Sequence, residues 1–319
     1  MPEPAPETYI ESFRPYLMPD VQDTKCVQGE AEFAGTRAQY IIEKPLEHVT
    51  DEVPMVIVPG YLGIKQAYVG LRRSIAQLGR SVVTLRPVRE QSVRAALHPS
   101  YLLNTGALPA RSVYGVMSDI QAEHGINSEV VDLIGHSMGG WVASNVAERH
   151  PSKVRSVTLV ASAGLVGHST GSFLKKMPAF TRHELAPAFW ALKEEGGELR
   201  LAVEALRYMV RNPYRTSVEA VGASNCNIRP SLSRLGELGV KTAILNFKAD
   251  RLIDNQKAEA ELERSVDYCK THPAKYLGHL APQMYPQLVA KFLTDISDTI
   301  NHDQAYGQAT DQATITYLS

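Results

Sequence analysis

Cysteine is scarce in this sequence, and the few thiols suit neither a disulfide framework nor a metal site. Cys26, Cys226 and Cys269 are odd in number, far apart in the chain and without Cys-x-x-Cys spacing. No pair of histidines has the spacing of metal ligands either. We therefore expect isolated thiols in a reducing compartment and no bound metal.

Excess charge of one sign and long apolar runs are also absent. The formal net charge is −1 and the pI is about 6.8, which excludes the basic footprint of a nucleic-acid or anionic-lipid binder. No apolar stretch approaches the roughly 20 residues of a membrane-spanning helix. Residues 1–7 are acidic and rich in proline, whereas a secretory signal is basic and then apolar. We expect a cytoplasmic protein without a membrane span or a nucleic-acid partner.

Apolar strand-like segments alternate with amphipathic helical segments along most of the chain. This alternation predicts a parallel sheet buried between helices. The helices are expected near residues 68–78, 112–124 and 140–150, and the strands near residues 53–60, 81–85, 130–134, 154–160 and 242–247.

The alternation of strands and helices stops after the strand expected at residues 154–160. Residues 164–235 are mainly helical and rich in bulky apolar side chains, so they form either a lid over a site or a unit with its own small core. Residues 1–20 are expected to form a loose arm, and residues 301–319 a flexible polar tail.

The most informative pattern is Gly-His-Ser-Met-Gly-Gly at residues 135–140. A β-branched strand precedes it and an amphipathic helix follows, which predicts a sharp strand-to-helix turn that can present Ser137 as a nucleophile. Glycines two residues before and after the serine are needed there because the neighbouring backbones approach closely. The spacing recurs around Ser169, but that serine follows a loop and the helix breaker Pro178 comes soon after. The flanking segments therefore favour Ser137.

A serine hydroxyl needs a base to take its proton and an acid to orient that base. The best candidate for the base is His279, which lies on a turn shortly before a helix that Pro286 begins. His272 is the competing candidate for the base. His136 adjoins Ser137, so we expect its side chain to point away from the hydroxyl and to be packed or hydrogen-bonded locally.

The acid is expected at the carboxyl end of the strand at residues 242–247, because open α/β sheets bind ligands at that edge. Asp250 lies in the loop directly after this strand. Asp254 is the alternative, although it is better placed to cap a helix at residues 256–264.

Backbone N–H groups must be in place for the oxyanion that forms in acyl transfer. One is expected from Met138, at the start of the helix after Ser137. The second is expected from Tyr61 in the loop Pro-Gly-Tyr-Leu-Gly at residues 59–63, which could also be an ordinary strand-to-helix turn.

The order Ser137, Asp250, His279, together with the loop at residues 59–63 and a helical insertion, resembles the α/β-hydrolase fold family over about residues 53–297. The resemblance implies a Ser-His-Asp catalytic triad, an oxyanion hole from the amides of Tyr61 and Met138, and no cofactor. Many members carry His-Gly after the first core strand, where this chain has Pro59-Gly60.

For the architecture, the resemblance implies an eight-stranded, mostly parallel sheet flanked by helices. Residues 21–163 and 236–300 would form this α/β core, and residues 164–235 a helical lid.

Serine at the turn favours acyl transfer through a covalent acyl-Ser137 intermediate over dehalogenase or epoxide hydrolase chemistry. We expect hydrolysis of a small or medium apolar carboxylic ester, with a small-molecule ester or acyl compound as the partner. An acyltransferase, thioesterase, lipase or cofactor-free haloperoxidase would use the same three residues. A ligand receptor on this fold would have no catalytic activity.

Overall fold

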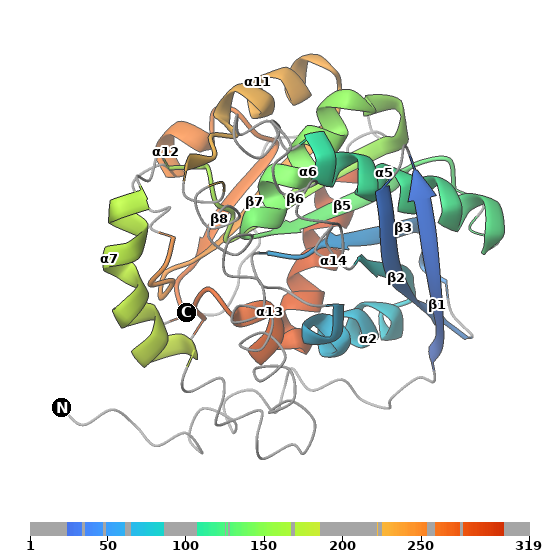
Figure 1. Cartoon of the computed structure of the whole chain (residues 1–319), viewed down its shortest axis with the longest axis horizontal. Coiled ribbons are helices and arrows are strands. Elements are labelled where there is room, and N and C mark those ends of the chain that lie inside the picture. Colours follow the sequence, from blue (N-terminus) through green and yellow to red (C-terminus); the bar gives the residue numbers. More distant parts are fainter. Residues whose placement is uncertain are drawn as a thin grey trace.

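The strands of the central sheet pair in the order β1-β2-β4-β3-β5-β6-β7-β8 (Figure 1). β2 is antiparallel to both β1 and β4, and the strands from β3 to β8 pair in parallel. The carboxyl ends of these parallel strands therefore lie along one edge. The strands are β1 Thr24–Phe33, β2 Thr36–Pro45, β3 Asp51–Val58, β4 Arg80–Leu85, β5 Val131–His136, β6 Val154–Val160, β7 Lys241–Phe247 and β8 Tyr268–His272.

The structure is a computed structural model of the 319-residue chain. It describes residues 24–33, 36–46, 49–60, 65–85, 107–124, 126, 128–166, 170–185, 222, 225–253, 259–274 and 277–302. The predicted arm at residues 1–20 and most of the predicted tail lie outside this range.

Helices cover both faces of the sheet, because its central strands are apolar on both sides. Along β3, Val56 and Val58 pack with α5, α6 and α11, whereas Met55 and Ile57 pack with α2 and α14 on the opposite face (Figure 1). The main helices are α2 Val69–Gln77, α5 Ala107–Glu123, α6 Met138–Arg149, α11 Arg229–Glu237 and α14 Pro286–His302. Shorter or peripheral elements are η2 Lys65–Tyr68, η3 Pro151–Lys153, α7 Thr170–Phe180, η4 Thr181–Leu185, α12 Glu259–Leu262 and α13 Ala281–Met284.

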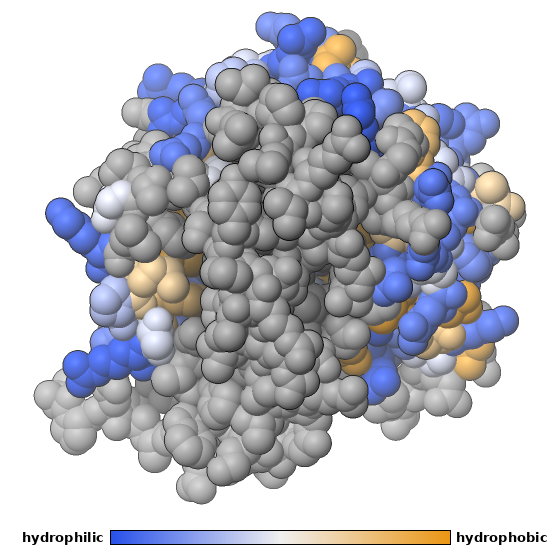
Figure 2. Space-filling model, in the orientation of Figure 1, coloured by the Kyte–Doolittle hydropathy of each residue, from blue (hydrophilic) through white to orange (hydrophobic). Residues whose placement is uncertain are grey.

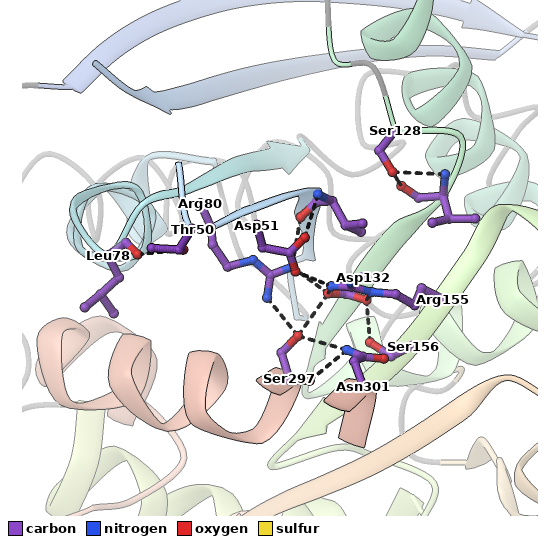
Figure 3. Close-up of polar contacts among 12 residues, drawn as sticks. Thr50, Asp51, Leu78, Arg80, Ser128, Asp132, Arg155, Ser156, Ser297 and Asn301 are labelled. Atoms are coloured by element: carbon purple, nitrogen blue, oxygen red, sulfur yellow. Dashed lines mark hydrogen bonds and ion pairs between the residues drawn. The ribbon is translucent and has the colours of Figure 1, made fainter. Parts of the chain in front are cut away.

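A buried network of charged and hydroxyl groups fastens the amino ends of the parallel strands to α14 (Figure 3). At its centre, Asp132 on β5 accepts hydrogen bonds from Arg80 at 2.6 Å, Arg155 at 2.5 Å and Ser297 at 3.0 Å. Burial alone would raise the pKa of Asp132, but the hydrogen bonds and charges of Arg155 and Arg80 hold that pKa below its usual value. Since Ser297 also accepts from Arg80 at 2.7 Å, the network joins β4, β5, β6 and α14.

Few large apolar side chains are exposed among the described residues. Figure 2 shows mainly hydrophilic residues around the part drawn in grey, with apolar residues in small separate groups. Among the described residues, the exposed large apolar side chains are Phe33, Leu46, Val49 and Leu238. In the same part of the chain, no helix has both the length and the apolar character needed to cross a membrane.

Three boundaries differ from the sequence-based expectation. α7 continues through Pro178 to Phe180, so the prediction that this proline breaks the chain's helical path is wrong. Pro178 has no N–H to donate to the preceding turn, and the chain passes into the π-helical turn η4 three residues later. Within the described residues, the helix expected at residues 256–264 is α12, which ends at Leu262, and α14 runs two residues into the predicted tail.

Candidate active site

Ser137 occupies the sharp turn between β5 and α6 that the sequence predicts. Its φ of 54° and ψ of −123° are unusual for a residue with a side chain, and such a conformation persists only when the surroundings hold it. A Cβ on Gly139 would lie 2.0 Å from the Val58 carbonyl oxygen, and one on Gly135 would lie 2.5 Å from the Gly140 Cα. Both glycines are therefore required by close backbone approach.

The three predicted catalytic side chains are in hydrogen-bond contact. The His279 Nε2 atom lies 2.9 Å from Ser137 Oγ, and its Nδ1 atom lies 2.9 Å from Asp250 Oδ2. Because an ionised carboxylate can only accept, Nδ1 carries the proton and Nε2 accepts from the serine hydroxyl. All three side chains are buried, and they come from the β5–α6 turn, the loop after β7 and the turn before α13.

Asp250 is held by the backbone that follows it. Its Oδ1 atom accepts the N–H groups of Leu252 and Ile253, each at 2.8 Å, which leaves Oδ2 for His279. Burial lowers the pKa of His279, but the charge and hydrogen bond of Asp250 and the charge of Glu184 raise it above its usual value overall. The arrangement can thus stabilise an imidazolium formed when His279 takes a proton.

His136 is buried beside His279, and its hydrogen bonds go to groups other than the Ser137 hydroxyl. Its Nε2 atom lies 2.8 Å from the backbone oxygen of His279, and its Nδ1 atom lies 2.7 Å from the Tyr68 hydroxyl. Since a carbonyl can only accept, Nε2 carries the proton and Tyr68 donates to Nδ1. Burial, followed by the neighbouring charge of His279, lowers the pKa of His136 to about 3, so it stays neutral near pH 7.

The start of the loop after β3 passes close to Ser137. A Cβ on Gly60 would lie 2.8 Å from the Cβ of Ser137, and the Gly60 N–H donates to the Tyr68 hydroxyl at 3.3 Å. Met138 is the first residue of α6, where backbone N–H groups have no partner within the helix. Tyr61, the other predicted oxyanion donor, lies outside the described residues.

One of the three competing residues can be placed. His272 ends β8, and its ring packs against Phe292 with centroids 4.8 Å apart. Burial, and then the charge of Lys270, lowers the pKa of His272. It therefore has its own partners at the edge of the sheet, whereas Ser169 and Asp254 lie outside the described residues.

Two polar residues of the site were not identified from the sequence. Tyr68 fits the apolar spacing of the helix expected near residues 68–78, and the partner of its hydroxyl, His136, is 68 residues away along the chain. Glu184 lies in η4, within the predicted lid, and accepts backbone N–H groups of the loops that carry Asp250 and His279. No local pattern distinguishes either residue, because only tertiary contacts give them a role.

The sheet order and the turn at Ser137 can now be compared with known proteins. A family model described as the alpha/beta hydrolase fold matches residues 110–260. The chain has the α/β-hydrolase fold. Among solved structures, this α/β-hydrolase resembles a membrane phospholipase A titled a bacterial virulence factor, with a TM-score of 0.64, 15% identity and coverage of 92% of this chain and 90% of that one. A likeness at such low identity is one of fold.

Curated relatives extend the comparison to sequence. This α/β-hydrolase is 25% identical to monoacylglycerol lipase abhd6-A of Xenopus laevis over 193 residues, which are 55% of this chain and 57% of the relative. It is also 25% identical to monoacylglycerol lipase ABHD6 of Homo sapiens over 194 residues, or 56% of this chain and 57% of the relative. The match therefore spans a little over half the length of these relatives.

The described part of the chain offers no cluster of three or more His, Cys, Asp or Glu side chains that could hold a metal ion. The chemistry available from the residues described above is proton transfer between Ser137 and His279, with Asp250 orienting the imidazole and stabilising its charged form.

Proposed function

We propose that this α/β-hydrolase is a serine ester hydrolase that works through a covalent acyl-Ser137 intermediate. The observation that carries the proposal is the buried hydrogen-bonded line from Ser137 Oγ through the His279 imidazole to Asp250 Oδ2, with both contacts at 2.9 Å. A nucleophile and base within hydrogen-bond reach, with the base oriented by a third group, are the requirements of this chemistry.

In the first half of the proposed reaction, His279 Nε2 takes the proton of Ser137 as Oγ attacks the ester carbonyl carbon. The resulting imidazolium, stabilised by Asp250, gives the proton to the leaving alcohol as the C–O bond breaks. In the second half, His279 takes a proton from water, which attacks the acyl-enzyme carbonyl. The proton then returns to Ser137 Oγ as the carboxylic acid leaves.

The negative oxygen of each tetrahedral intermediate would be bound by backbone N–H groups. We assign one donor to Met138, whose position at the start of α6 also supplies the positive end of the helix dipole. The second is assigned to Tyr61. The close passage of the preceding Gly60 over Ser137 supports this assignment.

For the substrate, we propose a carboxylic ester with a small or medium apolar acyl group. The relatives named monoacylglycerol lipases make a glycerol monoester the first compound to test. Residues 164–235 are proposed as a lid over the site. The contact of Phe180 in α7 with the ring of His279, with centroids 5.8 Å apart, supports that part of the proposal.

Labelling with a fluorophosphonate tests the catalytic proposal. The full chain should be labelled at Ser137, as identified by peptide mapping, and Ser137→Ala should abolish labelling. Ser169→Ala is the matched control, because it removes the serine of the second motif and should label normally. If the wild-type chain does not react, or if labelling persists in Ser137→Ala, the proposal is wrong.

A panel of p-nitrophenyl esters and monoacylglycerols of graded acyl length tests the substrate class. A rate that falls steeply beyond medium chains would support a bounded pocket beneath the lid, whereas indifference to length would contradict it. Adding an alcohol or amine acceptor to the same assay separates hydrolysis from acyl transfer, since transfer yields a new ester or amide instead of the free acid.

A further inference from the structure

We propose that Glu184 is a positioning residue, supplied by the predicted lid, that ties the loop of the catalytic acid to the loop of the catalytic base. This inference rests on the proposed function. We call residues 250–253 the acid loop and residues 277–280 the base loop. Glu184 itself does not contact Ser137 in the described structure, so its effect on catalysis would act through His279.

The carboxylate of Glu184 spans the two loops. Its Oε1 atom accepts the backbone N–H of Arg251 at 2.7 Å, and its Oε2 atom accepts that of Leu280 at 3.4 Å. These N–H groups belong to the residues directly after Asp250 and His279. A single side chain thus fixes the separation of the two backbone segments from which the acid and the base project, and geometry of this kind controls the reactive arrangement.

Gly278 leaves the space that this contact needs. A Cβ on Gly278 would lie 2.3 Å from Glu184 Oε2 and 2.6 Å from its Cδ, far inside normal contact distance. Backbone strain does not explain a glycine at this position, since Gly278 lies outside the left-handed region. The close approach of the Glu184 carboxylate is therefore the steric reason for glycine before the catalytic histidine.

The same segment also contacts the ring of the base. Phe180, four residues before Glu184, packs edge-on against the His279 ring at an interplanar angle of 85°. The His136 ring contacts the imidazole as well, with centroids 5.1 Å apart. The end of α7 and the turn η4 thus give two independent contacts to the base and its loop.

The negative charge of Glu184 should also affect the protonation of His279, in addition to the position of its loop. The titratable side chains that act on Glu184 from the packed loops are Asp250 and His279, whereas Arg182 and His183 of its own turn are exposed, as is Arg251. Burial, and then the charge of Asp250, raises the pKa of Glu184, and its backbone hydrogen bonds oppose this. When ionised, Glu184 raises the pKa of His279 and so favours the imidazolium.

The first test replaces Glu184 by glutamine and keeps the side-chain size. Glu184→Gln should lower the rate of fluorophosphonate labelling and ester turnover roughly ten- to a hundredfold, because one N–H loses its acceptor and the base loop is less firmly held. The acid limb of the pH–rate profile should move to lower pH, since His279 loses a neighbouring negative charge. The matched control is Asp267→Asn, which removes a carboxylate that accepts the Thr242 N–H at 2.6 Å at the opposite end of β7.

The second test leaves every polar residue in place. Gly278→Ala should displace the Glu184 carboxylate and reproduce the loss of rate. The double variant Glu184→Gln/Gly278→Ala should be little worse than either single variant, because both break the same contact. If Glu184→Gln does not fold, as judged by its thermal transition, the labelling rate of Gly278→Ala tests the positioning role of Glu184.

A measurement independent of activity separates this inference from the proposed function. The titration midpoint of His279, followed by NMR of its ring protons, should be lower in Glu184→Gln than in the wild type. Lack of labelling in the wild type would refute the proposed function. The His279 titration would still test whether Glu184 acts on His279. An unchanged midpoint together with a labelling rate equal to that of Asp267→Asn would overturn the inference, as would additive losses in the double variant.

Discussion

The hydroxyl of Tyr68 lies 2.7 Å from His136 Nδ1 and accepts the Gly60 N–H at 3.3 Å. Through His136, which donates to the His279 backbone oxygen, this hydroxyl joins the start of the loop after β3 to the segment that carries His279. The loop has Pro59-Gly60 where many α/β-hydrolases have His-Gly. In this chain Gly60 is held by Tyr68 of η2, which also contacts His136, the residue before Ser137.

Removal of that hydroxyl should weaken both the fold and the reaction. Tyr68→Phe leaves His136 Nδ1 and the Gly60 N–H without this partner, so we expect the free energy of unfolding to fall by about 1–3 kcal/mol. The labelling rate of the folded protein should fall as well. Urea unfolding and labelling measure the two effects, with Tyr114→Phe on α5 as a control remote from Ser137. Normal labelling in folded Tyr68→Phe would show that the hydroxyl does not position the site.

The low pKa of His136 predicts a pH-dependent stability. The folded state binds this proton only near pH 3, whereas the unfolded state binds it below about 6.5. The free energy of unfolding should therefore decrease as the pH falls through this window, by about 1.4 kcal/mol per pH unit between roughly 6 and 3. His136→Gln should show a shallower decrease in urea unfolding measured across the same range. Parallel pH profiles for the two proteins would contradict the assignment of a neutral buried imidazole.

The proposed role of Asp250 predicts a large effect of charge removal. Asp250→Asn keeps the shape but loses the charge that favours the Nδ1–H form of His279 and its imidazolium, so turnover should fall about 10³- to 10⁴-fold. Because Asp250 raises the pKa of His279, the acid limb of the remaining activity should move to lower pH. Asp254→Asn serves as the comparison in the same ester assay. A larger loss in Asp254→Asn would transfer the role of the acid to that residue.

The network around Asp132 predicts a loss of stability without a loss of chemistry. Asp132→Asn leaves the buried Arg80 guanidinium poorly compensated, which should cost about 3–5 kcal/mol in urea unfolding. Ser137 follows the other end of β5, so the folded fraction should label at the wild-type rate. The exposed pair of Asp267 and Lys241 provides the control, since Asp267→Asn should cost only about 1 kcal/mol. Equal losses in the two variants would contradict a special contribution from the buried network.

Alanine substitutions at two glycines should change the free energy of unfolding in opposite directions. Gly139→Ala would bring a methyl group to 2.0 Å from the Val58 carbonyl oxygen, so we expect a loss of about 3 kcal/mol or more. Gly236 in α11 has nothing within 4 Å of an added Cβ, and Gly236→Ala should stabilise the protein by about 0.5–1 kcal/mol. Thermal unfolding of both variants measures the difference. Equal tolerance at the two positions would mean that the turn at Ser137 can relax.

The sheet and its flanking helices could be predicted because their signals are local. Apolar runs such as β5 and the periodic face of α14 are visible in short windows of sequence, and their alternation determines the parallel arrangement. The candidate triad could be proposed for a related reason. Ser137, Asp250 and His279 each lie next to the boundary of a helix or strand, and such boundaries can be located from the sequence.

The contacts of Tyr68 and Glu184 could not be predicted in this way. Tyr68 fits the apolar spacing of a helix, and nothing nearby indicates that its hydroxyl meets His136. Glu184 is one acidic residue among many, and its two partners lie 67 and 96 residues further along the chain. Pro178 did not end α7 at the preceding residue, because a proline can disturb a helix without breaking it, and here the chain passes into the π-helical turn η4 shortly afterwards.

The hydrogen bond between Ser137 and His279 joins residues that are 142 positions apart in the chain. During synthesis at about 5–20 residues per second, the serine is made roughly 7 to 28 s before the histidine that would activate it. Asp250 also comes late. During that interval Ser137 has no histidine to take its proton. A chain truncated before residue 279 should therefore contain the serine and not react with esters.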